Sequence, residues 1–179
     1  DAQALYIDSY EGYMGFMSRF VPVFQSRNRL KKSLISQGLE EDAVYIQMSK
    51  EKQYYIFIAD LVEYTKLMHS EQGVKDNLCG AMSNLFEKGF LHNIYFFACM
   101  NQDQRADVMG KEVFEKFISG KAGIHMGGNV AAQRILEFTG MPFGEQTRSE
   151  KPGIGLIAST DGHKYHRIVI PLVKGPTVL

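Results

Sequence analysis

The stretch YYIFIADLVEY, residues 54–64, is an apolar run that ends at an acidic residue. A continuous apolar run of this length is typical of a strand buried on both faces of a parallel sheet. Asp60 stands where the strand is expected to end, and residues 60–70 continue as a helix. The stretch predicts a strand followed by a helix, in which Asp60 either caps the helix or belongs to a nucleotide-hydrolysis site.

Strand-like and helix-like segments alternate along the rest of the chain. Further strands are expected at residues 3–9, 93–100 and 121–128. Helical spacing of apolar residues predicts helices over residues 16–35, 74–88 and 111–119. Pro22 is expected to mark a kink or a second helix start, and Asn129 to cap a helix over residues 130–138. Residues 154–160 and 163–172 are expected to pair as a hairpin around Asp161 and Gly162.

This order of elements predicts a three-layer α/β fold, with a mainly parallel sheet and an antiparallel hairpin at the C-terminal end. With 179 residues, of which 45% are hydrophobic, the chain is expected to form one domain over residues 1–179. The chain begins with Asp directly before a strand-like segment, so we expect it to be a piece of a larger multi-domain protein.

Composition and charge argue against nucleic acid as a partner. Twenty basic residues balance twenty acidic residues, so the chain has no net charge to attract phosphates. The densest basic stretch, residues 26–32, has no interleaved aromatic residues and is interpreted as a solvated helix face. Cys79 and Cys99 lie in apolar surroundings typical of buried, reduced thiols.

Motifs for metal, covalent or phosphate chemistry are not found in the sequence. The five histidines are scattered, and no serine lies in a G-x-S-x-G elbow. The nearest candidate for a phosphate-binding loop is FISGKAG, residues 117–123, but Ala122 replaces the hydroxyl residue that holds magnesium. This segment also is expected to end a helix, whereas a phosphate-binding loop opens one. We therefore expect no metal site and no bound cofactor.

Several sequence segments, in the same order along the chain, resemble the FtsK/SpoIIIE type of P-loop ATPase module. They resemble most closely the C-terminal modules of the EssC family of type VII secretion motors. Residues 54–64 resemble the second nucleotide motif of that family, a strand that ends in two acidic residues. The other matching segments are residues 93–104, 122–138 and 151–157. Residues 4–9 resemble the strand that follows the P-loop helix. The resemblance implies a P-loop NTPase (RecA/FtsK)-like fold.

The departures from this pattern affect the catalytic carboxylates. Residue by residue, the magnesium-organising aspartate of the family falls on Ala59, and its acidic partner falls on Asp60. A shift by one residue gives Asp60 the metal role but puts Leu61 in place of the catalytic acid. Phosphoryl transfer depends on carboxylates that hold the metal and its water shell. Both alignments therefore predict a degenerate ATPase domain that does not hydrolyse nucleotide.

The resemblance implies that the chain is a cytoplasmic domain of a membrane-anchored parent protein. Its implied function is to recognise substrates or to regulate neighbouring ATPase modules. Its implied partners are the other ATPase modules of the parent chain and small helical secreted substrates, and a hexamer could form through the parent. The alternative is an active or nucleotide-binding ATPase domain whose P-loop lies upstream, with ATP and magnesium as cofactors and Asp60 or Glu63 as a substitute acid. A DNA-translocating motor is disfavoured because the chain has no basic stripe.

Contact residues for a protein partner are expected in two places. Asn129 and Arg134 are expected near the strand ends, where ligands of open α/β sheets bind. The loop from Thr139 to Lys151 carries Met141 and Phe143 among polar residues, and it is a candidate docking segment.

Overall fold

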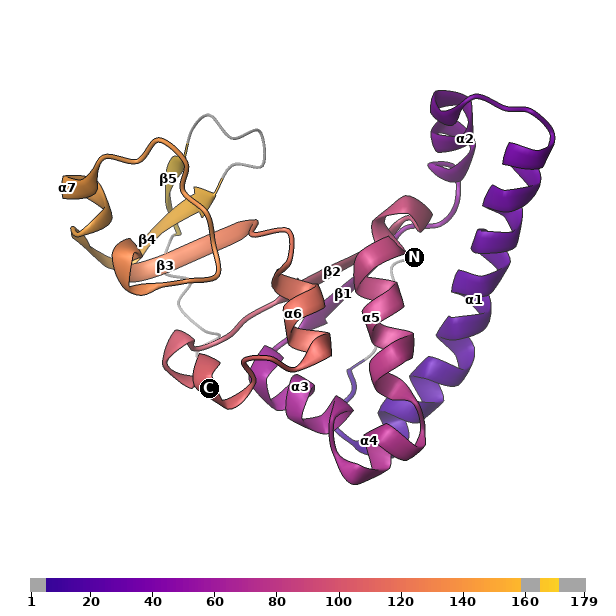
Figure 1. Ribbon diagram of the computed structural model, residues 1–179, viewed down its shortest axis with the longest axis horizontal. Coiled ribbons are helices and arrows are strands. Elements are labelled where there is room, and N and C mark those ends of the chain that lie inside the picture. Colours follow the sequence, from indigo (N-terminus) through magenta and orange to yellow (C-terminus); the bar gives the residue numbers. More distant parts are fainter. Residues whose placement is uncertain (1–5, 159–164, 171–179) are drawn as a thin grey trace, which may run out of the picture. The chain divides into compact units, whose positions relative to one another are not determined.

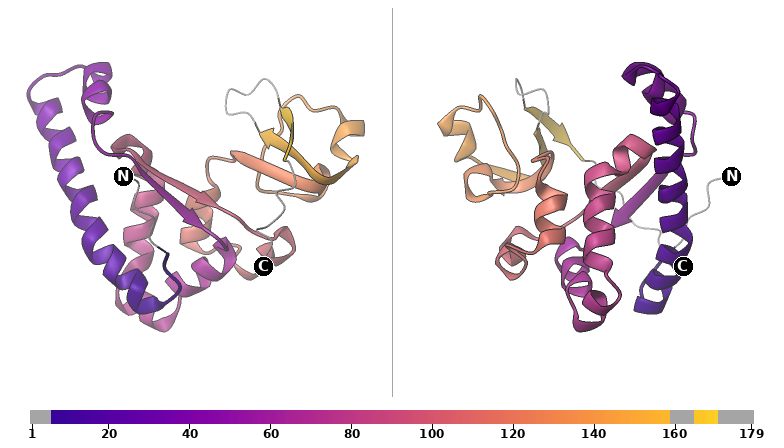
Figure 2. Two further views of the ribbon diagram at one scale, coloured as in Figure 1. Left: turned by 180° about the vertical axis from the view of Figure 1, so that it is seen from behind. Right: turned by 45° about the vertical axis from the view of Figure 1, so that its right-hand side comes forward.

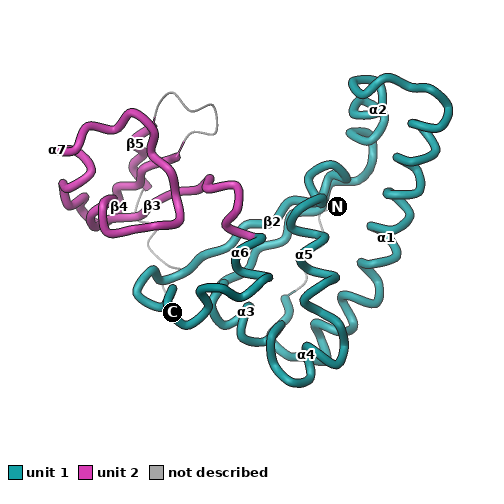
Figure 3. The backbone as a smooth tube through the Cα atoms, in the orientation of Figure 1, with its two compact units in different colours: residues 1–116 teal, residues 117–179 magenta. Residues whose placement is uncertain are grey.

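The computed structural model describes residues 6–158 and 165–170. The chain divides into two compact units, unit 1 over residues 1–116 and unit 2 over residues 117–179 (Figures 1 and 3). The expectation of a single domain over residues 1–179 stays a prediction.

Unit 1 is built mainly of helices around two strands. Its elements in chain order are α1 (Tyr10–Ser36), α2 (Glu41–Met48), β1 (Tyr54–Ile58), α3 (Leu61–Met68), α4 (Glu71–Lys75), α5 (Leu78–Lys88), the 3-10 helix η1 (Gly89–His92), β2 (Ile94–Ala98), the 3-10 helix η2 (Gln102–Asp107) and α6 (Glu112–Ile118), which runs across the boundary with unit 2. Helix α1 begins at Ser9, whose Oγ accepts a hydrogen bond from the Gly12 N–H, and it continues through Pro22. The second helix start expected at Pro22 is therefore wrong.

Strands β1 and β2 are parallel and lie side by side, as both views of Figure 2 show. Tyr54 pairs with Ile94, and the register continues to Ile58 and Ala98. One face of this pair lies under α1 and α5, because Phe20 packs edge-on against Tyr54 and Phe86 packs edge-on against Phe96. The other face is open: Tyr55 and Phe57 are exposed. The expectation that this strand is buried on both faces is wrong for the described residues.

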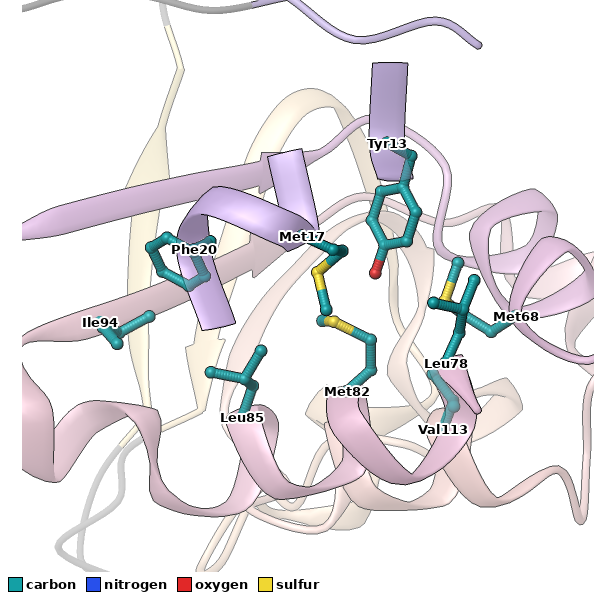
Figure 4. Packing of buried hydrophobic residues seen from close by; sticks show 9 residues of the cluster. All are labelled: Tyr13, Met17, Phe20, Met68, Leu78, Met82, Leu85, Ile94 and Val113. Carbon is teal, nitrogen blue, oxygen red and sulfur yellow. The ribbon is translucent and has the colours of Figure 1, made fainter. Parts of the chain in front are cut away.

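The core of unit 1 lies between the helices and the covered face of the strands. Its buried members, shown in Figure 4, are Tyr13, Met17, Phe20, Met68, Leu78, Met82, Leu85, Ile94 and Val113. These residues come from α1, α3, α5, β2 and α6, so the core joins elements that are far apart in the sequence. The basic stretch in α1 takes part in this arrangement: Arg27 is buried, which corrects the interpretation of residues 26–32 as a solvated face.

Unit 2 is a three-stranded antiparallel sheet with a small core. Strand β3 (Gly123–Asn129) pairs with β4 (Ser149–Ala158), and β4 pairs with β5 (His166–Val169). The connection from β3 to β4 contains the 3-10 helix η3 (Val130–Ala132) and the short helix α7 (Phe143–Gln146). The core is formed by Val130, Phe138, Met141, Leu156 and Ala158. Pairing of β4 with β5 confirms the C-terminal hairpin, although its turn at Asp161 and Gly162 lies outside the described residues.

The mixed α/β class is confirmed, but the mainly parallel, three-layer sheet is not found among the described residues. They contain one parallel pair and one antiparallel sheet of three strands. A parallel third strand requires a crossover of a dozen or more residues, usually through a helix. Strand β3 follows β2 after η2 and α6, but among the described residues it pairs with β4 in antiparallel fashion and not with β2. At the N-terminal end, Tyr6, Ile7 and Asp8 form no strand, and the remainder of that expected strand lies outside the described residues.

The helix expected over residues 130–138 is also wrong. The side chain of Gln133 accepts hydrogen bonds from the Ile135 and Leu136 N–H groups, at 2.8 and 2.6 Å. These amides would otherwise bond to backbone carbonyls within a helix, so the glutamine competes with helix formation. Gln133 is buried, and its Nε2 also donates to the Leu136 carbonyl oxygen.

Candidate functional site

The carboxyl ends of β1 and β2 form the candidate site in unit 1, because ligands of parallel α/β sheets bind at this edge. Two backbone hydrogen bonds join the strand ends there: the Cys99 N–H donates to the Ile58 carbonyl oxygen, and the Leu61 N–H donates to that of Cys99. Ala59 follows directly after β1 and is exposed. Asp60 stands at the start of α3.

Asp60 is the N-cap of α3. Its Oδ1 accepts hydrogen bonds from the N–H groups of Val62 and Glu63, at 2.8 and 3.1 Å. A helix leaves its first N–H groups without partners within the helix, and an aspartate at this position supplies the missing acceptor. The structure thus confirms the capping role expected for Asp60 and gives its carboxylate a structural task.

Glu63 lies in the first turn of α3 and is exposed. Its Oε1 is 2.9 Å from the Nζ of Lys66, which also lies 3.1 Å from the Oδ2 of Asp107. The hydrogen bond to Glu63, followed by the one to Asp107, raises the pKa of Lys66 above its ordinary value. Glu63 is thus placed in an exposed ion-pair network that links α3 to η2.

At this edge, the side chains expected to organise magnesium either lack an oxygen or make local hydrogen bonds. Ala59 offers a methyl group where the metal-organising oxygen is expected, and one oxygen of Asp60 is occupied by two amides. Asn101, after β2, also uses its side chain locally, because its Oδ1 accepts from the Asp103 N–H. Among residues 6–158 and 165–170, no group of three or more histidine, cysteine or acidic side chains could hold a metal ion.

The segment FISGKAG ends a helix, as expected from the sequence. Helix α6 ends at Ile118, and Lys121 adopts a left-handed backbone conformation before β3 begins at Gly123. A phosphate-binding loop requires the opposite order, a strand that leads through the loop into a helix.

The residues expected to contact a partner lie in unit 2. Asn129 ends β3, and its Oδ1 accepts a hydrogen bond from the Ala131 N–H, so it caps η3. Arg134 is exposed, and its Nη1 donates to the Ala131 carbonyl oxygen. Asn129 and Arg134 therefore both bond to the backbone of Ala131.

The two apolar candidates of the loop have different environments. Met141 is buried in the core of unit 2, where it holds the loop in place. Phe143, the first residue of α7, is 78% exposed. The structure separates a packing residue from an exposed aromatic residue that the sequence pattern had grouped together.

Sequence reasoning missed the open aromatic face of β1 and β2 and the exposed Cys99 after β2. Tyr55 and Phe57 stack with Tyr95 and Phe97 on that face. Because both strands are apolar at every position, the sequence carries no alternation that would distinguish a covered face from an open one. The prediction that Cys99 is buried is wrong, whereas Cys79 is half-buried.

Comparisons with known proteins identify the fold. No known protein family matches the sequence, and no curated protein matches it. The chain is similar in structure to the cytoplasmic domain of EssC, with a TM-score of 0.67 and 16% sequence identity over 94% of this chain. It is also similar to EssC (ATPases 2 and 3) from Geobacillus thermodenitrificans, with a TM-score of 0.60 and 18% identity over 95% of this chain.

These similarities show that the chain has the fold of an EssC-like ATPase module, at low sequence identity. The chain spans 30% and 27% of the lengths of those two solved chains. No helix in the described part of the chain is long and apolar enough to cross a membrane.

Proposed function

We propose that this chain is a non-hydrolysing ATPase-like module of a type VII secretion motor, and that it works by binding proteins. The proposal is carried by the residues that follow the carboxyl end of β1. Ala59 has no oxygen for a metal, and Asp60 uses its Oδ1 to cap α3. The EssC-like fold supports the assignment to a secretion motor.

The loss of catalytic carboxylates bears directly on hydrolysis. Phosphoryl transfer relies on positioning and electrostatic stabilisation by metal ions and carboxylates, and the protein contributes little covalent chemistry. A module that keeps its fold without these groups can still act by binding other proteins through its surface. In the proposal these surfaces bind neighbouring ATPase modules of the same assembly or small helical secreted proteins, on the cytoplasmic side of a membrane-anchored parent.

Arg134 and Phe143 are the proposed contact residues in unit 2. Both are exposed, and arginine and aromatic side chains are the residues that most often dominate binding energy at protein interfaces. Asn129 shapes the turn that carries Arg134, and Met141 anchors the loop that carries Phe143. We assign positioning roles to this second pair.

Thermal unfolding with nucleotide tests the first half of the proposal. A ligand present at one hundred times its dissociation constant adds about 2.7 kcal/mol to the free energy of unfolding. We expect no change in the unfolding midpoint with millimolar MgATP or MgADP, compared with magnesium chloride alone. An upward shift of several degrees with nucleotide would overturn the proposal and favour the nucleotide-binding alternative.

Binding measurements test the second half. Purified small helical secreted proteins and the neighbouring ATPase modules of the same assembly are titrated against the chain by calorimetry. Phe143→Ser and Arg134→Ala are expected to weaken binding about tenfold or more. The matched control is Phe90→Ser in unit 1, which removes another exposed phenylalanine. No heat of binding with any of these proteins would count against a role in protein recognition.

A further inference from the structure

Polar contacts at the junction of η1 and β2 hold α2 and the segment that follows it. Helix α2 has eight residues, and its buried side chains are those of Val44 and Met48. The side-chain amide of Asn93 donates to the carbonyl oxygens of Met48 and Glu51, at 3.1 and 2.9 Å. A short helix with few buried apolar side chains is among the parts of a fold that open at low free energy.

His92 lies at the centre of this junction. It is 2% exposed, and its ring packs edge-on against Phe24 with ring centroids 5.1 Å apart. The described residues offer its Nδ1 no hydrogen-bond partner. Its carbonyl oxygen accepts from Arg27, which also donates to the carbonyl oxygen of Lys52. The neutral imidazole is therefore enclosed close to a buried guanidinium.

Cations on the neighbouring helices disfavour a proton on His92. The positive charges of Lys31 and Arg27, both on α1, act against a charged imidazole. Helix α5 ends with another cation, Lys88, directly before η1. A protonated His92 would be a buried cation close to other cations, and a buried charge is costly unless it is paired.

The acidic groups of the neighbouring elements do not remove this cost. The Oε2 of Glu51, in the segment before β1, lies 3.6 Å from the Arg27 Nε. Helix α2 meets the junction through its last residue, Met48, whereas its acidic residues Glu41 and Asp42 lie in its first turn. Strand β2 carries no charged residue.

We propose that His92 is an acid-sensitive latch for α2: when His92 binds a proton, the junction opens, and α2 and residues 49–53 detach while the core of unit 1 stays folded. None of the nine core residues in Figure 4 comes from α2 or from residues 49–53. Opening gives the imidazolium access to water and uncovers Val44 and Met48. The latch thus links acidification to exposure of the apolar side of α2.

The direction of the pH dependence follows from the two states of His92. Burial, followed by Lys31 and Arg27, lowers the pKa of His92 in the closed state below its ordinary value. The open state has the ordinary pKa of about 6.5 and therefore binds the proton more tightly. The opening constant rises about tenfold per pH unit below about pH 6.5, down to the lowered pKa of the closed state.

Hydrogen exchange of backbone amides in the full chain, followed by mass spectrometry between about pH 7.5 and 5.5, tests the proposal. The amides of Val44 and Ser49 are hydrogen-bonded in the closed state, and a detached helix of this length does not persist in water. Peptides within residues 44–51 should open more readily than those of α5 at every pH. Corrected for intrinsic exchange rates, their opening constant should rise about tenfold per pH unit below about pH 6.5. An opening constant equal to that of α5, or one independent of pH, would overturn the proposal.

Two histidine variants show which group senses the pH. Glutamine does not titrate in this range, so in His92→Gln the opening constant of residues 44–51 should no longer change with pH. His69→Gln is the matched control, because His69, at the end of α3, is another histidine of unit 1 whose pKa is lowered by burial. The rise should persist in His69→Gln. Loss of the rise in both variants, or its persistence in His92→Gln, would contradict the latch.

Discussion

The guanidinium of Arg27 donates a 2.5 Å hydrogen bond from Nη1 to the carbonyl oxygen of His92, inside unit 1. Its Nη2 donates to the Lys52 carbonyl oxygen, also at 2.5 Å, and its Cζ lies 4.9 Å from the centroid of the Tyr54 ring. Glu51 completes the surroundings, with its Oε2 3.6 Å from the Arg27 Nε. One side chain from α1 thereby joins the segments that lead into β1 and β2.

Arg27→Met is expected to lower the free energy of unfolding by about 3 kcal/mol. The substitution removes two hydrogen bonds from a charged donor and leaves the His92 and Lys52 carbonyl oxygens without that donor. It also removes the cation–π contact with Tyr54. Urea denaturation of the purified chain measures the change.

Arg29→Met is the matched control, because Arg29 is exposed on the same helix. It should change the free energy of unfolding by no more than about 0.5 kcal/mol. Equal effects of the two substitutions would show that the buried contacts of Arg27 carry no special stability.

His92 is expected to make the stability of unit 1 depend on pH. Burial, followed by the nearby Lys31 and Arg27, lowers the pKa of His92 below its ordinary value. The unfolded chain therefore binds a proton more readily than the folded chain. The free energy of unfolding contributed by this group is fully present above about pH 6.5 and falls as the pH drops toward the lowered folded pKa.

The measurement is urea denaturation at a series of pH values from 7.5 to 5 for the unsubstituted chain and for His92→Gln, analysed as the slope of stability against pH. The free energy of unfolding of His92→Gln should fall less steeply as the pH drops. Part of the fall remains in this variant, because burial lowers the pKa of His69 as well. An identical slope in His92→Gln would contradict the assignment.

Asp60→Asn and Asp60→Ala separate capping from catalysis. Asparagine retains an oxygen that can accept from the Val62 and Glu63 amides, so Asp60→Asn should be close to neutral in stability. Asp60→Ala should lower the free energy of unfolding by about 1 kcal/mol because the cap is lost. Thermal or urea unfolding measures both variants, and a nucleotide-dependent difference between Asp60→Asn and the unsubstituted chain would point to a role beyond the cap.

The sequence was sufficient for features that depend on local patterns. The strand at residues 54–58, its helix and the cap at Asp60 follow from an apolar run that meets an aspartate. The parallel pairing of β1 with β2 follows from two such runs joined by helices. The C-terminal hairpin follows in the same way from two β-rich segments around a turn signal.

The features that were missed depend on tertiary contacts. Residues 54–58 and 94–98 are apolar throughout, so no periodicity shows that only the face under α1 and α5 is covered. Gln133 favours neither helix nor loop by itself, and its two hydrogen bonds to following amides decide the outcome. Arg27 belongs to a basic stretch, and only the positions of Lys52 and His92 in space make it a buried donor.

The same substitution is expected to have opposite effects at Gly73 and Gly15. A Cβ atom on Gly73 would lie 2.5 Å from the Met68 carbonyl oxygen and 2.6 Å from that of Leu67. Both are backbone atoms, so the chain itself has to move, and Gly73→Ala should lower the free energy of unfolding by about 2 kcal/mol or more. At Gly15, inside α1, a Cβ atom meets no described atom within 4 Å. Gly15→Ala should therefore raise stability by about 0.5–1 kcal/mol, because alanine loses less backbone entropy in a helix. Urea denaturation of the two variants beside the unsubstituted chain gives the signs, and a stabilising Gly73→Ala would show that α4 does not pack against the end of α3 as described.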